Sequence, residues 1–512
     1  MKEESGLRVS PRLTGWAADA LLAVLPDGAA DRPALFAAPD GASFSRSLPA
    51  WHRSTPADQR LGFWLRRHPS LGARERRWLS DRVYDVLRHG RAYETFLRQY
   101  SIDPGSPGGG NAIRPARAGQ GDAPLPSVPP DGGREGTAGV QAMQRVQAVQ
   151  EGRLLALIHL SEAMRQQASA ARAPSSPPCQ DVPRQDGEQQ CGADAQHGIH
   201  PWHETDALTT LAGDYTRWLA TQPPAVRFSL PDWLWQRIGA AHGEQAPALA
   251  AHLLLPASTD IRCNLLKGKP AALQKLLAAA GLAAEPVAEV PTALRLSGRP
   301  ALARLPQFGQ GWFELQDAGS QAIVDTCGVR RGARVIDFCA GAGGKTLALA
   351  ARMRNQGQIL AFDTEEARLS RLTPRLMRAG VDIVTTLRID GCDDPRLVRY
   401  QGWADLVLVD APCSGSGTLR RHPDLKWRLQ PDDVDHYQQL QRTIVLAALR
   451  LLRPGGRLVY ATCSLLADEN AQQMQWLAER LGSGWQATAQ RAWLPGEQGG
   501  DAFFMAAWEK PG

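Results

Sequence analysis

The segment Val335-Ile-Asp-Phe-Cys-Ala-Gly-Ala-Gly-Gly-Lys-Thr346 decides the fold of this 512-residue chain. Its apolar, β-branched start predicts a strand, and its glycines predict a tight turn that leads directly into a helix. Glycines let a ligand approach the backbone closely, and the N-terminus of a helix offers N–H groups without partners. We therefore expect this segment to be the first strand, turn and helix of a ligand-binding α/β domain.

Outward from this segment, apolar strand-like runs alternate with helical segments, which is typical of a doubly wound parallel sheet. The expected strands are Arg334–Phe338, Gln358–Asp363, Val384–Ile389, Leu406–Asp410 and Arg457–Thr462. A last strand at Ala502–Trp508 is expected to pair at the end of the sheet. Pro374 is expected to kink or restart the helix that follows Asp363.

The glycine-rich turn does not match the templates for nucleoside triphosphates or dinucleotides. A P-loop needs glycine where the chain has Cys339, and the dinucleotide fingerprint needs glycine where it has Thr346. Asp363 ends the second strand, where a carboxylate can take both hydroxyls of a ribose, and Asp390 follows the third, level with an adenine amine. This set favours S-adenosylmethionine as the cofactor, although either aspartate alone could be a helix N-cap.

Two cysteines and an aspartate follow the fourth and fifth expected strands. Asp410 and Cys413 lie in Asp410-Ala-Pro-Cys413, and Cys463 lies in Ala461-Thr-Cys-Ser464. The carboxyl ends of parallel strands meet at one edge of a sheet, so these groups are expected to face the cofactor. The alternative is that both cysteines are small apolar core residues.

A methyltransferase needs a thiol when its target is C5 of a pyrimidine, because that carbon is a poor nucleophile. A thiolate that adds to C6 makes C5 enamine-like, so that C5 can accept a methyl group. A base then removes the C5 proton and the thiol leaves, while a carboxylate near N3 assists the addition through a shared proton.

With these residues assembled, the chain resembles the Nol/Nop/Sun family of RNA cytosine-C5 methyltransferases, and is most similar to bacterial RsmB-type small-subunit rRNA enzymes. The resemblance covers roughly residues 225–510. The matching segments are Ile261–Lys267, Leu315–Gln321, Asp337–Thr346, Asp410–Thr418, Arg420–Trp427, Pro454–Gly456, Ala461–Ser464, Asp468–Asn470, Leu494–Gly496 and Gly500–Phe504.

The resemblance implies a role for each of these residues. Cys463 would be the nucleophile, Cys413 would assist proton removal or product release, and Asp410 would contact the base and the cofactor. Lys345 would neutralise the carboxylate of the cofactor's methionine end. The segment implied to hold that end consists of Cys339, Ala340, Gly341, Ala342, Gly343, Gly344 and Lys345.

Two segments depart from the family pattern. The chain has Gly341-Ala342 where the family usually has Ala-Pro, and this change is expected to loosen the cofactor loop. It also has Ala318-Gly319-Ser320 where the family often has Glu-Ala-Ser, which bears on contacts at the substrate side.

The expected organisation is a Rossmann-like class I methyltransferase domain at 311–512, preceded by a small family-specific N1-type α+β domain at 202–310. Residues 10–171 are expected to form an all-α domain that resembles a NusB-like RNA-binding domain, with a low-complexity insert at 101–137. Residues 172–200 read as a low-complexity linker. The cluster Cys179, Cys191, His197, His200 and His203 fits no standard zinc spacing, so no metal is expected.

The charge distribution indicates a polyanionic partner. The chain has 58 basic and 52 acidic residues, but residues 51–100 carry eleven arginines and five acids. In this stretch Trp78, Leu79, Val83, Val86 and Leu87 recur at helical spacing, with arginines on the other face. No uncharged stretch is long enough to cross a bilayer, and a cytoplasmic monomer is expected.

The predicted function is 5-methylcytosine formation in small-subunit rRNA. A tRNA cytosine-C5 methyltransferase and a non-catalytic RNA-binding ribosome assembly factor stay as alternatives. Retention of Asp363, Asp390, Asp410, Cys413 and Cys463 argues against the non-catalytic one.

Overall fold

The computed structural model describes residues 16–21, 56–97, 100–103, 112–115, 158, 160, 161, 164, 205–482, 484–496 and 499–512. The chain divides into two compact units, Met1–Pro231 and Asp232–Gly512, and each is described by itself. The expected low-complexity insert lies mostly outside the described residues, as do the linker and the cluster of cysteines and histidines at 179–203.

The described part of the first unit consists of helices and a short antiparallel hairpin. Its elements are α3 (Ala57–Arg67), α4 (Ala73–Leu97), β1 (Tyr100–Asp103), β2 (Ala112–Pro115), α6 (Thr205–Ala220) and α7 (Pro224–Arg227). The rings of Tyr93 and Phe96 on α4 pack edge-on against Tyr215 on α6. The described residues of this unit are mostly helical, but the β1–β2 hairpin shows that the expectation of an all-α unit is wrong, and the likeness of the unit to NusB stays a prediction.

The apolar face predicted for α4 is confirmed, but the arginines on this helix do not share one solvated face. Arg74 and Arg77 are exposed, whereas Arg82 and Arg88 are buried. Arg76 donates to the carbonyl oxygens of Leu71, Leu65 and His68, and so ties α4 to α3. A guanidinium that donates to backbone carbonyls can be buried at low cost, and a period-based reading does not detect this.

The second unit contains a seven-stranded sheet with the strand order β12-β13-β11-β10-β7-β8-β9. The strands are β7 (Arg334–Asp337), β8 (Gln358–Asp363), β9 (Val384–Arg388), β10 (Ala404–Asp410), β11 (Leu452–Thr462), β12 (Gln486–Trp493) and β13 (Phe503–Glu509). Strands β7 to β11 are parallel, as expected, and β13 is antiparallel to both of its neighbours. The chain order reverses between β7 and β10, which is where open α/β sheets bind ligands.

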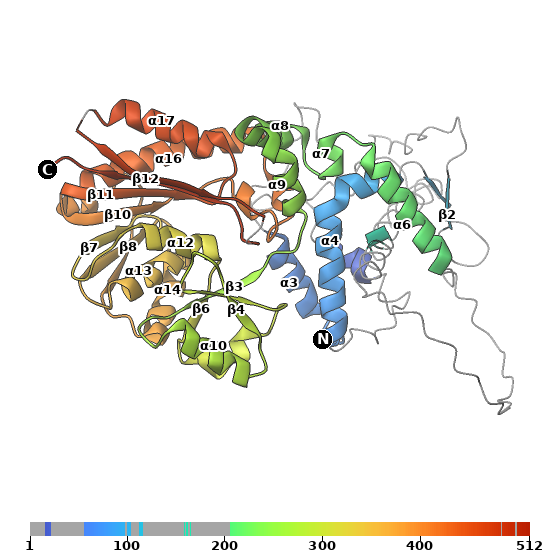
Figure 1. The fold of residues 1–512 in the computed structure, drawn as a ribbon, viewed down its shortest axis with the longest axis horizontal. Coiled ribbons are helices and arrows are strands. Elements are labelled where there is room, and N and C mark those ends of the chain that lie inside the picture. The colour runs from blue at the N-terminus through green and yellow to red at the C-terminus, as the bar shows by residue number, and fades with distance from the viewer. Residues whose placement is uncertain are drawn as a thin grey trace, which may run out of the picture. The chain divides into compact units, whose positions relative to one another are not determined.

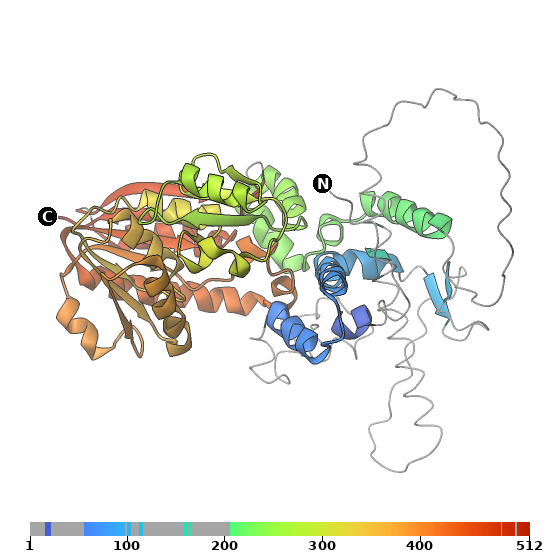
Figure 2. The same ribbon diagram turned by 90° about the horizontal axis from the view of Figure 1, so that it is seen from below.

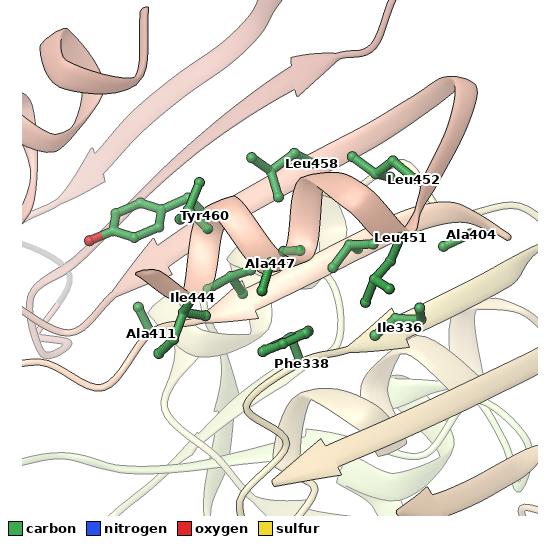
Figure 3. Close-up of a cluster of buried hydrophobic side chains, with 14 of the residues drawn as sticks. Ile336, Phe338, Ala404, Ala411, Ile444, Ala447, Leu451, Leu452, Leu458 and Tyr460 are labelled. Atoms are coloured by element: carbon green, nitrogen blue, oxygen red, sulfur yellow. The ribbon is translucent and has the colours of Figure 1, made fainter. Parts of the chain in front are cut away.

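Helices cover both faces of this sheet, so its central strands are buried on both sides (Figure 1). One face carries α12 (Ala318–Thr326), α13 (Gly344–Arg352) and α14 (Glu366–Ala379). The other carries α16 (Pro431–Leu451), α17 (Ala471–Arg480) and the 3₁₀ helix η3 (Pro395–Tyr400). In Figure 3, Ile444, Ala447 and Leu451 of α16 point toward Ile336 and Phe338 of the β7 segment.

Two expectations about this domain need correction. The strand near the C-terminus, β13, is not at the end of the sheet, because β12 pairs with its outer side. The sequence reading missed β12, whose side chains are mostly exposed and show no apolar alternation. Of the two outcomes expected at Pro374, the restart is wrong, since α14 runs through it from Glu366 to Ala379, and the kink stays a prediction.

A small antiparallel sheet precedes the large one in the second unit, with the strand order β4-β5-β3-β6. The elements of this segment are α8 (Asp232–His242), the 3₁₀ helix η1 (Gly243–Gln245), α9 (Ala246–Leu253), β3 (Thr259–Cys263), α10 (Pro270–Ala279), β4 (Ala284–Pro286), β5 (Ala293–Leu296), the 3₁₀ helix η2 (Leu302–Arg304), α11 (Pro306–Gly309) and β6 (Phe313–Leu315). The yellow-green segment with this sheet lies against the large-sheet domain in both views (Figures 1 and 2).

None of the helices in the described part of the chain is long and apolar enough to cross a lipid bilayer.

Candidate functional site

The glycine-rich turn joins β7 to α13 and needs two glycines for its shape. Gly341 and Gly343 have φ angles of +56° and +81°, which side chains with a Cβ adopt only with strain. A Cβ on Gly343 would lie 2.1 Å from Leu372 Cδ1, whereas a Cβ on Gly341 would meet nothing within 4 Å. The turn therefore packs tightly on α14 at Gly343 and leaves open space at Gly341.

Asp363, at the end of β8, lies beside this turn as expected. Its Oδ2 accepts from the Gly341 N–H at 2.7 Å, and its Oδ1 accepts from the Glu365 N–H at 2.9 Å. Each carboxylate oxygen can accept a second hydrogen bond. The predicted pairing with ribose hydroxyls stays a prediction, and the structure adds that Asp363 also shapes the turn.

Asp390 follows β9 but is mostly exposed, and its carboxylate forms ion pairs with Arg388 at 2.9 Å and Arg396 at 3.6 Å. The sequence reading missed the buried Asp394 next to it. The carboxylate of Asp394 accepts from the Asp390 N–H at 2.9 Å and is held by the Arg396 side chain at 2.6 Å. Asp394 thus orders the loop on which Asp390 lies.

Two arginines from outside the turn hold its carbonyl groups. Arg375 donates to the Ala342 carbonyl oxygen at 2.5 Å and pairs with Glu314. Arg262 donates to the Gly344 carbonyl oxygen at 2.6 Å and to Gln316 at 2.7 Å. The turn that contains the Gly341-Ala342 departure is therefore held by side chains from β3, β6 and α14. The sequence near Arg262 and Arg375 gives no sign that either arginine contacts this turn.

The other departure, at Gly319, is explained by packing. A Cβ on Gly319 would lie 2.4 Å from Cδ2 of Phe503 and could not fit beside that ring as it is placed. Phe503 in turn lies 5.8 Å from the Lys345 ammonium, measured to the ring centroid. Glycine at 319 thus admits an aromatic ring next to the buried lysine of the turn.

Lys345 joins the cofactor turn to the loop after β10. Its Nζ lies 2.7 Å from Oδ2 of Asp410, and the lysine side chain is buried. Burial alone would lower the pKa of Lys345, but the Asp410 carboxylate outweighs it and the pKa is raised. The ammonium is therefore charged and engaged by Asp410, a partner that the sequence reading did not assign to it.

Asp337 is buried at the end of β7, beneath the turn. Its Oδ2 accepts from the Thr346 hydroxyl at 2.7 Å, and its Oδ1 has no hydrogen-bond partner among the described residues. Burial raises the pKa of this carboxyl to about 7. Asp337 thus carries a titratable oxygen close to the turn.

Cys413 and Cys463 come together at the carboxyl edge of the sheet, as predicted, with their Sγ atoms 3.3 Å apart. Both are free thiols and are partly buried. The contact with Cys463 and burial raise the pKa of Cys413 well above its usual range. Either sulfur can be the donor in this contact, and the raised pKa of Cys413 favours the protonated form of its own thiol.

Sequence comparisons match two parts of the second unit. The family described as 16S rRNA methyltransferase RsmB/F matches residues 327–509, and the one described as Methyltr_RsmF/B-like, ferredoxin-like domain matches residues 230–302. Ribosomal RNA small subunit methyltransferase B of Vibrio cholerae is 35% identical over 301 residues, 57% of this chain and 68% of that protein. The protein of the same name from Citrobacter koseri is 35% identical over 286 residues, 55% of this chain and 66% of that protein.

The chain belongs to the RsmB/F methyltransferase family. This membership confirms the resemblance identified from the motifs, and the cofactor is S-adenosylmethionine, as predicted. The matched residues cover about two thirds of each of these relatives.

Solved structures show the same fold for the RsmB/F-type domain. A methyltransferase homologue from Pyrococcus horikoshii is 28% identical, with a TM-score of 0.50, and the match covers 56% of this chain and 97% of that one. NSun6 from Pyrococcus horikoshii, solved with SFG, an analogue of S-adenosylmethionine, is 21% identical with a TM-score of 0.50. That match covers 55% of this chain and 98% of NSun6 and bears on the fold alone.

Proposed function

We propose that this RsmB/F-family protein forms 5-methylcytosine in small-subunit rRNA through a covalent bond between Cys463 and C6 of the target cytosine. The observation that carries the proposal is the 3.3 Å contact between Cys463 Sγ and Cys413 Sγ beside the Lys345–Asp410 pair. The relatives named Ribosomal RNA small subunit methyltransferase B support the choice of rRNA over tRNA.

The residues around the glycine-rich turn fit S-adenosylmethionine. The space beside Gly341 and the free lone pairs of Asp363 suit a nucleoside, and Asp390 is the group proposed for the adenine amine. Residues 339–345 would hold the methionine end. When bound there, the cofactor supplies a methyl group on a positively charged sulfur.

Chemistry begins at Cys463. Its thiolate attacks C6 of the cytosine, the C6–S bond forms, and the electron pair of the C5–C6 double bond becomes available at C5. Asp410 is the proposed partner of N3, and the Lys345 ammonium paired with it would supply the shared proton that takes up the charge developing on the ring. The electron-rich C5 would be the acceptor of the methyl group that the cofactor supplies, and the C5–methyl bond would form as the methyl–sulfur bond breaks.

Release needs the C5 proton to leave and the C6–S bond to break, so that the ring double bond re-forms and the Cys463 thiolate is restored. The raised pKa of Cys413 supports a helper role, because a thiol that stays protonated is a poor nucleophile. In the proposed step it relays the C5 proton, accepting that proton as its own passes to water. The target cytosine would have to leave its stack to reach these groups. A monomeric, cytoplasmic enzyme that binds no metal stays a prediction.

The product and substrate can be tested together. The purified protein is incubated with S-adenosylmethionine and, separately, with small-subunit rRNA and total tRNA, and each RNA is then sequenced after bisulfite treatment. We expect one protected cytosine, or a small set, in the rRNA. Protection in tRNA alone would replace the rRNA assignment with the tRNA alternative, and no protection in either RNA would favour the non-catalytic assembly factor.

A further inference from the structure

Glu469, in the 3₁₀ helix η5 (Ala467–Glu469), is a fully buried carboxylate beneath the two cysteines. Its Oε1 accepts from the Ser414 N–H at 2.8 Å and from Gln441 Nε2 at 3.1 Å. Its Oε2 accepts from the hydroxyls of Ser414 and Ser464, each at 2.5 Å. Ser414 directly follows Cys413 and Ser464 directly follows Cys463, so one carboxylate holds the residues next to both thiols.

Further contacts make the two loops a single unit around Glu469. The Ser416 hydroxyl lies 3.1 Å from the Ser464 hydroxyl and accepts from the Leu465 N–H at 2.9 Å. The Gly417 N–H donates to the Cys463 carbonyl oxygen at 3.0 Å. The Tyr460 hydroxyl donates to the Glu469 carbonyl oxygen at 2.7 Å, which fixes the carboxylate's own backbone.

A buried carboxylate is a costly way to hold two loops together. Burial raises the pKa of Glu469, and its hydrogen-bond donors oppose this by stabilising the charged form. Apolar side chains could fill the same space without desolvating a charge, but they would not fix the orientation of the two cysteine loops. Four hydrogen bonds to one rigid carboxylate set the distance between the loops as packing alone cannot.

We infer that Glu469 is the positioning residue that sets the separation of Cys413 and Cys463. This inference rests on the proposed function, since it assumes that both thiols act on the cytosine. Glu469 itself touches no reacting atom. It acts through Ser414 and Ser464, and this gives a role to the Asp468-Glu-Asn470 motif, which the catalytic scheme does not use.

The test uses Glu469→Ala and Glu469→Gln in the full-length protein. Alanine removes all four hydrogen bonds that the Glu469 side chain accepts. Glutamine keeps the shape and the Oε1 acceptor, and the two serine hydroxyls can turn to accept from its amide. The control is Asp405→Asn, because Asp405 also ties separate segments, accepting from the Arg334 N–H at 2.7 Å and the Arg453 side chain at 2.5 Å, but at the amino-terminal end of β10.

We expect Glu469→Ala to lower kcat by about a hundredfold, since a misplacement of about 1 Å has that effect on a positioned reaction. The KM values for RNA and S-adenosylmethionine should stay within about twofold, because neither binding region is touched. Glu469→Gln should recover most of the lost kcat, and Asp405→Asn should keep the wild-type kcat even where its melting temperature falls.

An alanine variant with wild-type kcat, or one whose loss appears only in KM or equally in the Asp405→Asn control, overturns the inference. Failure of the proposed function would be seen in other measurements, made on the wild type and on Cys463→Ala. In that case the wild-type protein gives no 5-methylcytosine, or Cys463→Ala stays active, and the Glu469 variants are then not needed to decide it.

Discussion

The Sγ atoms of Cys413 and Cys463 lie 3.3 Å apart, although fifty residues separate them in the chain. Each cysteine follows the carboxyl end of a strand, and the two strands, β10 and β11, are parallel neighbours in the sheet. A hydrogen bond from the Gly417 N–H to the Cys463 carbonyl oxygen, 3.0 Å long, adds a direct link between their loops. The two thiols therefore occupy adjacent positions at the carboxyl edge of the sheet.

Cys463→Ala should abolish methylation while leaving S-adenosylmethionine binding intact. Without the thiolate no C6 adduct forms, and C5 stays too weak a nucleophile, so we expect turnover to fall by about a thousandfold or more. Transfer of a labelled methyl group to RNA measures the turnover, and calorimetric titration measures cofactor binding. Persistent turnover would show that another group is the nucleophile.

Cys413→Ala should leave the enzyme attached to its RNA. Addition to C6 and methyl transfer need Cys463, but release needs the C5 proton to be removed and the C6–S bond to break. We expect a protein–RNA species that survives denaturing electrophoresis in the presence of S-adenosylmethionine. The double variant with Cys463→Ala is the control and should form none. If Cys413→Ala turns over normally without such a species, Cys413 has no role in release.

Gly343→Ala and Gly341→Ala form a matched pair in the cofactor turn. Both glycines have positive φ, but only at Gly343 would the new Cβ strike Leu372. We expect Gly341→Ala to cost about 1 kcal/mol of stability or a little more, as for alanine in a left-handed conformation. Gly343→Ala should cost more and abolish S-adenosylmethionine binding. Equal losses in melting temperature and cofactor affinity would contradict the packing at Leu372.

Asp337 should make the stability of the protein depend on pH. Its pKa is raised to about 7 by burial, so the folded state keeps this proton while the unfolded state has lost it. Stability is therefore lost as pH rises from about 4 to 7, by on the order of 4 kcal/mol, and the loss levels off above that range. In Asp337→Asn this contribution is absent.

The measurement for Asp337 is the difference in melting temperature between the wild type and Asp337→Asn across pH 5 to 8. The wild type should lose stability relative to the variant as pH rises. Parallel curves would show that the carboxyl has an ordinary pKa in the folded protein.

Charge reversal at Arg74 and Arg77 should weaken RNA binding. Both are exposed on α4, and for each phosphate that an arginine no longer neutralises, the slope of log affinity against log salt should fall by about one. Arg76→Glu is a different test, because Arg76 donates to three carbonyl groups and its replacement should lower the melting temperature. An unchanged salt slope in the Arg74 and Arg77 variant would mean that these arginines do not neutralise RNA phosphates.

Much of the α/β domain could be predicted from sequence because its signals are local. The strands β7 to β11 are apolar runs that are buried in the sheet, and the glycines at 341 and 343 mark a turn that only a positive φ can make. The edge strand β12 was not predicted because its exposed side chains show no apolar pattern. Its place in the sheet is marked by its antiparallel pairing with β13, which no local pattern indicates.

By itself the sequence determined that Asp363, Asp410, Cys413 and Cys463 share one edge, since the carboxyl ends of parallel strands must meet there. Only the tertiary structure decided which buried charges pair. Lys345 engages Asp410, Arg375 and Arg262 hold the turn, and Glu469 joins the two cysteine loops. The reason is physical: a buried polar side chain needs hydrogen-bond partners, and these partners come from segments that are distant in the sequence. A local sequence pattern therefore does not predict which segments supply them.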